Sequence, residues 1–180
     1  LLYDKDEESG IQVISELLRE RFGFKKELIR TLVLKNPTVL SKTKGQINFF
    51  FDYFNRNKQI DEKTLMKLVF DVPVLLNVDI ALKAKEIEEL FKVYHQMTSE
   101  DVKSIFLDFP YLYCCPSHKI QKFLAEFRKY RLTKEQILNL SKNSGGLLGC
   151  KPSNLVGFFN YLKWEHEIKA SEVVRILDDY

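Results

Sequence analysis

The sequence predicts an all-α fold: a superhelical solenoid, right- or left-handed, built from about five copies of a two-helix unit. Its clearest sign is a proline phrase that recurs after 36 and 37 residues, as Pro37-Thr38-Val39-Leu40, Pro73-Val74-Leu75-Leu76 and Pro110-Tyr111-Leu112-Tyr113. Between the phrases, apolar residues recur at i, i+3 and i+4, the spacing of an amphipathic helix. No segment alternates apolar and polar residues over the length of a strand. Self-similarity at a fixed period of this length is typical of repeat proteins.

The helix before each proline phrase is predicted from an apolar triplet. The triplets begin 36, 37, 35 and 36 residues apart and read Ile29/Leu32/Val33, Leu65/Leu68/Val69, Val102/Ile105/Phe106, Ile137/Leu140/Ser141 and Val173/Ile176/Leu177. Four residues before three of them lie Asp61, Thr98 and Thr133, whose side-chain oxygens suit a helix N-cap. The other two copies have Lys25 and Lys169 there. Thr133 and Gln136 also have the spacing of a capping box.

The proline phrase itself predicts the end of that helix and one short 3₁₀ turn. Proline cannot donate the helical hydrogen bond, and it keeps the residue before it out of the α region. It can nevertheless begin a new helical turn, where its missing N–H costs nothing. A fourth copy, Gly145-Gly146-Leu147-Leu148, lacks the proline, and there the glycine pair predicts a flexible C-cap instead.

A second, more aromatic helix is predicted after each proline phrase. Its apolar stripes read Ile47/Phe50/Phe51/Phe54, Ile87/Leu90/Phe91/Tyr94, Ile120/Phe123/Leu124/Phe127 and Leu155/Phe158/Phe159/Leu162, with Ile14/Leu17/Leu18 ahead of the first triplet. The i, i+3, i+4, i+7 spacing is helical. Each unit therefore consists of a helix, a short break, a second helix and the proline phrase.

In these features the sequence resembles the mitochondrial transcription termination factor (mTERF) repeat family. The resemblance depends on the repeated P-x-L-L endings and on helix openings such as Leu132-Thr133-Lys134-Glu135-Gln136-Ile137, and it covers essentially the whole chain. It implies a superhelix of mTERF-like repeats, each of two α-helices and a 3₁₀ helix, with irregular packing expected where Tyr113 and Gly145 depart from the pattern. We expect a single domain over residues 1–180, a fragment of a longer chain or processed from one, because Leu1-Leu2 has the form of an earlier phrase's tail.

The resemblance also implies a function. Members of the family act in mitochondria, or in plastids of plants, and bind double-stranded DNA or ribosomal RNA along a basic concave groove. They affect transcription, its termination or ribosome assembly. We therefore expect an organellar nucleic-acid-binding protein. The alternative is a scaffolding repeat subunit that docks a protein partner, such as an rRNA methyltransferase or a ribosomal subunit.

Other repeat classes fit the sequence less well. Tetratricopeptide units need small residues where their helices cross, and this chain has large aromatic residues at those places. Repeats that read one base each need paired polar residues at equivalent positions, and no such periodic pair is found.

Basic residues are the candidate binding residues, although the formal charge is only +3, from 28 basic and 25 acidic side chains. A cluster recurs near the end of the aromatic helix, as Arg19/Arg21, Arg56/Lys58, Arg128/Lys129/Arg131 and Lys163, with His95 interrupting the series. Another basic residue follows the first apolar position of the preceding helix: Arg30, Lys67, Lys103 and Arg175. Stacked repeats would align such residues into a ridge that tracks a phosphate backbone, although cations also suit helix C-termini for local reasons. The predicted nucleic-acid-binding residues are Arg30, Lys67, Lys103, Arg56, Lys58, Arg128, Lys129, Arg131 and Lys163.

The sequence has no pattern that indicates an enzyme, a cofactor or a metal site. Cys114, Cys115 and Cys150 lack C-x-x-C spacing, and we expect them to be small buried side chains in a reducing compartment. No histidine has a partner at metal-ligand spacing, and no phosphate-binding glycine loop is present. The apolar runs are far shorter than the roughly 20 residues that span a bilayer, so no membrane partner is expected.

Most of the 14 phenylalanines lie in the predicted buried stripes. The aromatic residues outside the strict stripes are candidates for stacking on unpaired bases. They are Tyr111, Tyr113, Tyr130 and Trp164.

Overall fold

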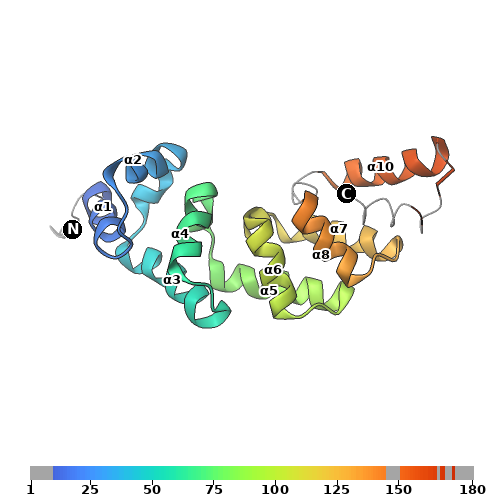
Figure 1. The fold of residues 1–180 in the computed structure, drawn as a ribbon, viewed down its shortest axis with the longest axis horizontal. Coiled ribbons are helices and arrows are strands. Elements are labelled where there is room, and N and C mark those ends of the chain that lie inside the picture. The colour runs from blue at the N-terminus through green and yellow to red at the C-terminus, as the bar shows by residue number, and fades with distance from the viewer. Residues whose placement is uncertain (1–9, 145–150, 166, 169–171, 173–180) are drawn as a thin grey trace, which may run out of the picture. The chain divides into compact units, whose positions relative to one another are not determined.

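The computed structural model describes residues 10–144, 151–165, 167, 168 and 172, and within them it contains helices and no strands. The elements in chain order are α1 (Gly10–Glu20), α2 (Lys26–Lys35), η1 (Pro37–Ser41), α3 (Lys44–Lys58), α4 (Glu62–Asp71), η2 (Pro73–Asn77), α5 (Ile80–His95), α6 (Ser99–Asp108), η3 (Pro110–Cys114), α7 (Ser117–Lys129), α8 (Lys134–Ser144) and α10 (Pro152–Glu165), where η denotes a 3₁₀ helix (Figure 1). The predicted all-α class is confirmed. No helix among the described residues is long and apolar enough to cross a membrane.

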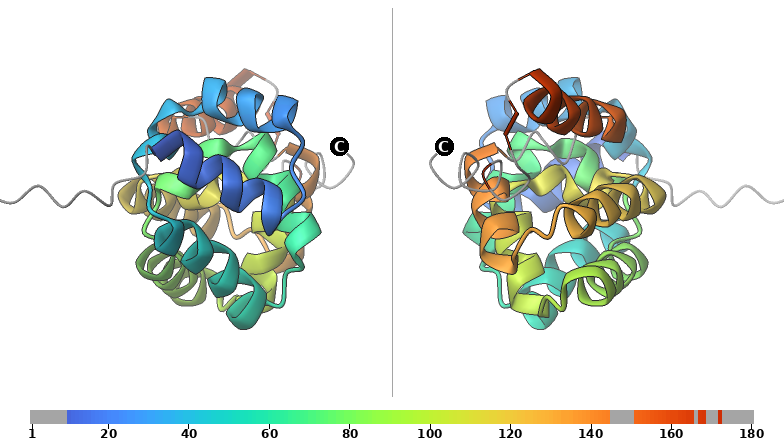
Figure 2. Two further views of the ribbon diagram at one scale, coloured as in Figure 1. Left: turned by 90° about the vertical axis from the view of Figure 1, so that its left-hand side faces the viewer. Right: turned by 90° about the vertical axis from the view of Figure 1, so that its right-hand side faces the viewer.

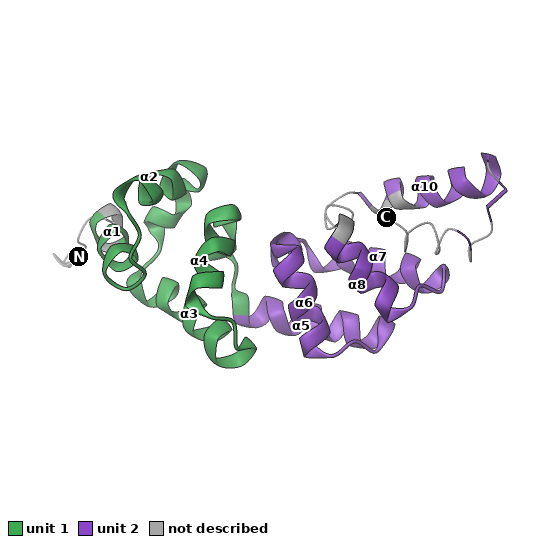
Figure 3. Ribbon diagram, viewed as in Figure 1, with its two compact units in different colours: residues 1–80 green, residues 81–180 purple. Residues whose placement is uncertain are grey.

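The chain forms two compact units, residues 1–80 and 81–180 (Figure 3). In the first unit α1 lies between α2 and α3 (Figure 2), and η1 packs against both α1 and α2. In the second unit α6 packs against α8 and η3, and α7 packs against α10. The single domain over residues 1–180 and the superhelical course of the repeats stay predictions.

The predicted apolar positions form the core of both units. All three members of the triplets on α4 and α6 are buried, as are the four stripe residues of α3 and of α7. One stripe member was wrongly predicted: Phe158 on α10 is 40% exposed, whereas Phe159 is 1% exposed. Adjacent helical residues point about 100° apart, and α10 turns Phe159 inward, onto Tyr130 at 4.0 Å between ring centroids. The fifth triplet, at Val173, lies outside the described residues.

Each of the three prolines begins a 3₁₀ helix, as the sequence predicts. The residues before them, Asn36, Val72 and Phe109, have left the α region, with ψ between 72° and 80°. In the first unit the turns are joined by side chains: Asn36 Nδ2 donates to the Pro73 carbonyl at 2.8 Å, and Asn77 Nδ2 donates to Thr38 Oγ1 at 2.7 Å. The Gly145-Gly146 copy lies outside the described residues.

The predicted N-caps are also confirmed. Asp61 Oδ1 accepts from the Thr64 N–H at 2.9 Å, and Thr133 forms the predicted capping box with Gln136. Thr98 forms a capping box as well, with Asp101. A further capping box, of Thr43 and Gln46, opens α3 and was not predicted.

A left-handed residue ends the first helix of every repeat, and the sequence did not predict it. These residues are Gly23, Gln59, Gln96, Arg131 and Glu167, with φ between 51° and 65°, and they lie 36, 37, 35 and 36 residues apart. The residue after each one donates its N–H back across the turn: Phe24 to Leu18 O, Ile60 to Phe54 O, Met97 to Phe91 O, Leu132 to Phe127 O and Ile168 to Leu162 O. Four of these hydrogen bonds span six residues, as in a Schellman C-cap, and the one from Leu132 to Phe127 spans five. In every case an apolar residue follows the left-handed position. We call this turn the corner of the repeat.

The corner yields a stability prediction at Gln59. A left-handed conformation costs an L-residue roughly 1–2 kcal/mol, and glycine avoids this cost. Glycine in turn loses more backbone entropy on folding, which costs about 0.5–1 kcal/mol. Gln59→Gly should therefore raise the free energy of unfolding by about 0.5–1 kcal/mol in a urea titration. The control Lys63→Gly, at an exposed position in α4, should lower it by about 1 kcal/mol. Equal destabilisation by both variants would contradict the assignment.

Candidate nucleic-acid interface

All nine predicted binding residues lie in the described part of the chain, but they differ in solvent exposure. Seven are exposed: Arg30, Lys67, Arg56, Arg128, Lys129, Arg131 and Lys163. Lys103 is half-buried, and Lys58 is buried at 8% exposure. A phosphate group can reach the first seven directly, and it cannot approach Lys58 in this conformation.

Three of the predicted residues form ion pairs within the chain. Lys103 Nζ lies 2.9 Å from Glu100 Oε2, and Lys129 Nζ lies 3.3 Å from Glu126 Oε2. Arg56 Nη2 lies 4.0 Å from Asp52 Oδ2. A carboxylate at this distance offsets much of the attraction that the cation would have for a phosphate.

Lys58 is buried because it occupies a core position of the repeat. It directly precedes the left-handed Gln59, and the equivalent residues in other corners are Phe22, His95 and Tyr130. Phe22 packs on Phe51 at 4.0 Å between ring centroids, and His95 Nε2 lies 3.0 Å from the Leu124 carbonyl. This position therefore makes the contact with the following repeat.

His95 shows the electrostatic effect of this position. Burial lowers the pKa of His95, and the nearby Arg128 guanidinium lowers it further, although the Leu124 carbonyl opposes both. A neutral imidazole at ordinary pH is consistent with a packing role. His95 therefore does not replace a cation of the predicted ridge.

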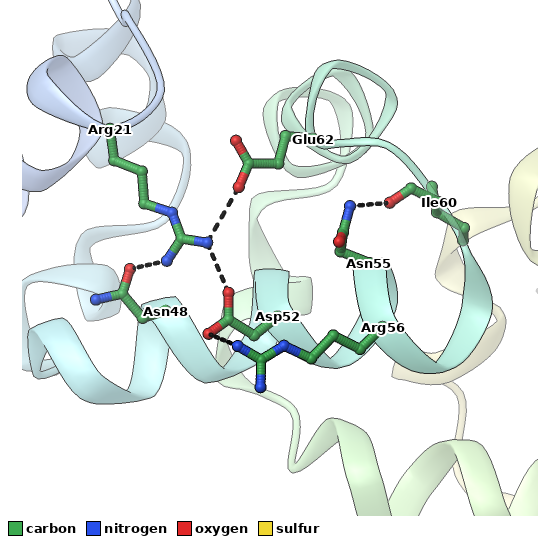
Figure 4. A network of polar contacts seen from close by, with 7 residues as sticks. All are labelled: Arg21, Asn48, Asp52, Asn55, Arg56, Ile60 and Glu62. Carbon is green, nitrogen blue, oxygen red and sulfur yellow. Dashed lines mark hydrogen bonds and ion pairs between the residues drawn. The ribbon is translucent and has the colours of Figure 1, made fainter.

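Arg21, part of the first predicted cluster, joins α1 to both helices of the next repeat (Figure 4). Its guanidinium donates to Asn48 Oδ1 on α3, to Asp52 Oδ1 at 2.6 Å and to Glu62 Oε1 on α4 at 3.0 Å. The hydrogen bond from Arg21 holds the pKa of the Asp52 carboxyl below its usual range. Arg21 is thus a structural residue, and its charge is balanced within the protein.

The Arg21 network gives a second stability prediction. Arg21→Met should lower the free energy of unfolding at pH 7 by about 1–2 kcal/mol, since its ion pairs are partly exposed and screened. The matched control is Arg19→Met, at an exposed position in the last turn of α1, which should change stability by less than about 0.5 kcal/mol. Urea titrations of both variants measure the difference, and an effect of Arg19→Met as large as that of Arg21→Met would refute the role given to Arg21.

The same network predicts a pH dependence. Because the pKa of Asp52 is lower in the folded protein than in the unfolded chain, its contribution is complete above the unfolded value of about 3.9. It is lost as the pH falls through the folded value. The stability difference between the wild type and Arg21→Met should therefore be constant from pH 7 to pH 5 and shrink below about pH 4. A difference that stays constant down to pH 2 would argue against the ion pair.

One position of the repeat carries an exposed cation in four of five copies. This position directly follows the residue whose carbonyl accepts the corner hydrogen bond. In the five copies it is occupied by Arg19, Asn55, Lys92, Arg128 and Lys163. All five side chains are exposed. Within the described residues, none of the four cations has a carboxylate at ion-pair distance. We call Lys92, Arg128 and Lys163, which lie in the second unit, the cation column; Arg19 is the equivalent residue of the first unit.

Arg19, Arg128 and Lys163 belong to the basic clusters predicted from the sequence, whereas Lys92 was not predicted. The predicted series was interrupted at His95, but His95 is equivalent to Lys58 and not to Arg128. The missed signal is a basic residue directly after a buried apolar one, as in Leu18-Arg19, Phe91-Lys92 and Phe127-Arg128. Only the corner hydrogen bond shows that these pairs are equivalent.

A groove of about 700 Å³ lies between α5 and α7, and Arg128 is one of its lining residues. Lys85 and His118 line it together with the carboxylates Glu86 and Glu89. Because the groove has both signs of charge, it does not favour a polyanion. The exposed cation column, in which no carboxylate takes part, suits a phosphate backbone better.

The aromatic residues predicted to stack on bases also differ in exposure. Tyr113 was wrongly predicted to be available for stacking: it is 1% exposed and lies 4.6 Å from Phe106 between ring centroids. It occupies the inward place of η3 that buried Leu76 occupies in η2. Tyr130 is half-buried against Phe159, whereas Tyr111 and Trp164 are 49% and 72% exposed.

The two described cysteines are shielded from solvent to different degrees. Cys115 is buried and Cys114 is half-buried. Burial raises the pKa of the Cys114 thiol to about 12 and also raises that of Cys115, so both are protonated. Cys150 lies outside the described residues. No group of three His, Cys, Asp or Glu side chains in the described part of the chain is placed to hold a metal ion.

The arrangement of two α-helices, a 3₁₀ helix and a periodic corner agrees with a comparison to known protein families. The family model described as mTERF matches residues 5–93. This part of the chain belongs to the mTERF family. No curated protein sequence matches the chain. The mTERF match ends within α5, and the same unit continues beyond it, with a corner at Gln96, a proline phrase at Pro110 and another corner at Arg131.

Proposed function

We propose that this mTERF repeat protein binds nucleic acid through its phosphate backbone, with the cation column as the principal contact in the second unit. The observation that carries the proposal is the recurrence of an exposed cation, without an acidic partner, at one position of the repeat. A column with the period of the fold suits a ligand whose charges also repeat. The mTERF family of residues 5–93 supports the same conclusion.

Contacts of this kind recognise charge more than sequence. Lysine and arginine bound to phosphates release counterions, so the affinity should fall steeply as salt rises. Phosphate contacts fix the position of a protein on the nucleic acid without reading bases. The target is double-stranded DNA or ribosomal RNA, and a choice between them depends on backbone geometry.

The family supports a proposal for the biological setting. We place the protein in mitochondria, or in plastids if it comes from a plant, with a role in transcription, its termination or ribosome assembly. A protein partner such as an rRNA methyltransferase or a ribosomal subunit is compatible with this role. The cation column leaves the rest of the surface free for such a partner.

A matched pair of variants tests the proposal. Lys92→Gln/Arg128→Gln/Lys163→Gln removes the cation column, and Arg56→Gln/Lys103→Gln/Lys129→Gln removes three cations that are already ion-paired. Both change the net charge equally. Fluorescence titrations with duplex DNA, ribosomal RNA fragments and single strands at several salt concentrations give the slope of log K against log salt. The column variant should lower that slope by about 0.9 per lost contact on duplex DNA, and the control should change it much less.

Two results would overturn the proposal. The first is equal loss of affinity in the two variants, since the effect would then reflect net charge alone. The second is wild-type binding no stronger than non-specific binding for every nucleic acid tried. The second result would favour the scaffolding alternative.

A further inference from the structure

The groove between α5 and α7 lies between the first helices of two successive repeats, and all its lining residues belong to the second unit. In the first unit, α1 and α3 are the equivalent pair of helices. The corner hydrogen bonds align the two pairs, because Leu18 and Phe54 accept where Phe91 and Phe127 accept. Each position of one pair can therefore be compared with the same position of the other.

Charged side chains connect α1 to α3 in the first unit. Lys44 Nζ on α3 lies 3.7 Å from Glu16 Oε2 on α1, and Arg21 Nη2 lies 2.6 Å from Asp52 Oδ1. The exposed Glu20 keeps the outer edge of α1 polar. The surface between these two helices is thus bridged by ion pairs.

The second unit has no charged residue at four of these five positions. Lys44, Arg21, Asp52 and Glu20 are replaced by Ser117, Tyr94, Ala125 and Val93, in that order. A neutral hydrogen bond, from Gln121 Nε2 to Tyr94 Oη at 3.3 Å, connects α5 to α7 instead. The loss of charge makes the surface between these helices more apolar than its counterpart in the first unit.

The apolar lining of the groove suits a helix. Leu82 and Val93 are 59% and 64% exposed, and the half-buried Leu90 lies between them in the sequence. Leu82 and Val93 lie three turns of α5 apart, which is about 16 Å. An apolar surface with polar edges is typical of a protein-binding site, and a groove between two helices accepts a third helix. The described residues offer no strand edge that would bind an extended peptide.

Two charged lining residues of α5 are available to a partner. Lys85 and Glu89 are exposed, and neither has an ion-pair partner in the part of the chain that the structure describes. Glu86 is already engaged, since Ser117 Oγ donates to it and Lys83 Nζ lies 3.6 Å from it. Lys85 and Glu89 are four residues apart, about 6 Å along the helix axis. A carboxylate and a cation four residues apart on another helix have the same spacing.

From these observations we propose that the groove between α5 and α7 binds an amphipathic helix of a partner protein. The apolar side of that helix packs on Leu82, Leu90 and Val93. At its edge, a carboxylate pairs with Lys85 and a cation four residues away pairs with Glu89. The proposal does not depend on nucleic-acid binding.

Site-specific cross-linking locates the partner. Val93→p-benzoylphenylalanine places a photoreactive side chain in the groove, and Glu20→p-benzoylphenylalanine places one at the equivalent position of the first unit. Both proteins are irradiated in a lysate of the source organism, and the cross-linked peptides are sequenced by mass spectrometry. Position 93 should cross-link to one segment with helical apolar spacing and the expected charge pair, and position 20 should not.

Binding of that segment as a labelled synthetic peptide tests the contacts by fluorescence anisotropy. Val93→Glu should weaken the affinity at least about tenfold, because it places an unpaired charge in the apolar contact. Lys85→Glu/Glu89→Lys should weaken it roughly two- to tenfold, the range of two exposed ion pairs. Exchanging the acid and the base of the peptide should restore the affinity for this double variant. The substituted residues are exposed, so urea midpoints equal to that of the wild type will show that the variants are folded.

Several results would overturn the proposal. Equal cross-linking at positions 93 and 20 would do so, as would a cross-linked peptide that binds the Val93→Glu variant as tightly as the wild type. A cross-link from position 93 to nucleic acid, to a second copy of this chain or to another part of the same chain would replace the proposed partner. Failure of the exchanged peptide to restore binding would refute the charge pairing.

A salt titration with duplex DNA separates this proposal from the proposed function. Lys85→Glu/Glu89→Lys leaves the net charge unchanged and retains Lys92, Arg128 and Lys163, so its salt slope should match that of the wild type. Weaker peptide binding with an unchanged slope supports the groove as a separate site. Absence of nucleic-acid binding in a protein that binds the peptide refutes only the proposed function.

Discussion

Every repeat depends on the backbone hydrogen bond that closes its corner. The N–H after the left-handed residue bonds to a carbonyl one and a half turns back, which stops the first helix and reverses the chain. The same turn buries an apolar residue, from Phe24 in the first corner to Leu132 in the fourth. The second helix starts at once, and its apolar triplet meets the aromatic stripe of the first. Without this closure, neither helix would have a fixed partner.

The corner also decides which basic residues are available to a ligand. Residues that lie close together in the sequence near a helix end point in different directions, because each step turns the side chain by about 100°. Arg128 therefore stands free while its neighbour Lys129 pairs with Glu126, and Lys58 is buried while Arg56 is exposed. A basic cluster in the sequence is thus a mixture of structural and available charges. The carbonyl that accepts the corner hydrogen bond shows which basic residues occupy equivalent positions in successive repeats.

The sequence predicted the features that depend on local chemistry. The proline phrases, the capping residues Asp61, Thr98 and Thr133 and the apolar triplets each act within one or two helical turns, so their residue types suffice. The corners were missed because four of the five left-handed residues are not glycine. The role of Arg21 was missed because its partners lie 27, 31 and 41 residues away. Lys92 was missed because its equivalence to Arg128 is defined by backbone hydrogen bonds.

The four left-handed side chains have a thermodynamic consequence. Gln59, Gln96, Arg131 and Glu167 each hold a conformation that costs an L-residue roughly 1–2 kcal/mol. In an array whose stability is a sum of local terms, each of these residues makes its own repeat less stable than a repeat that, like the first, has glycine at this place.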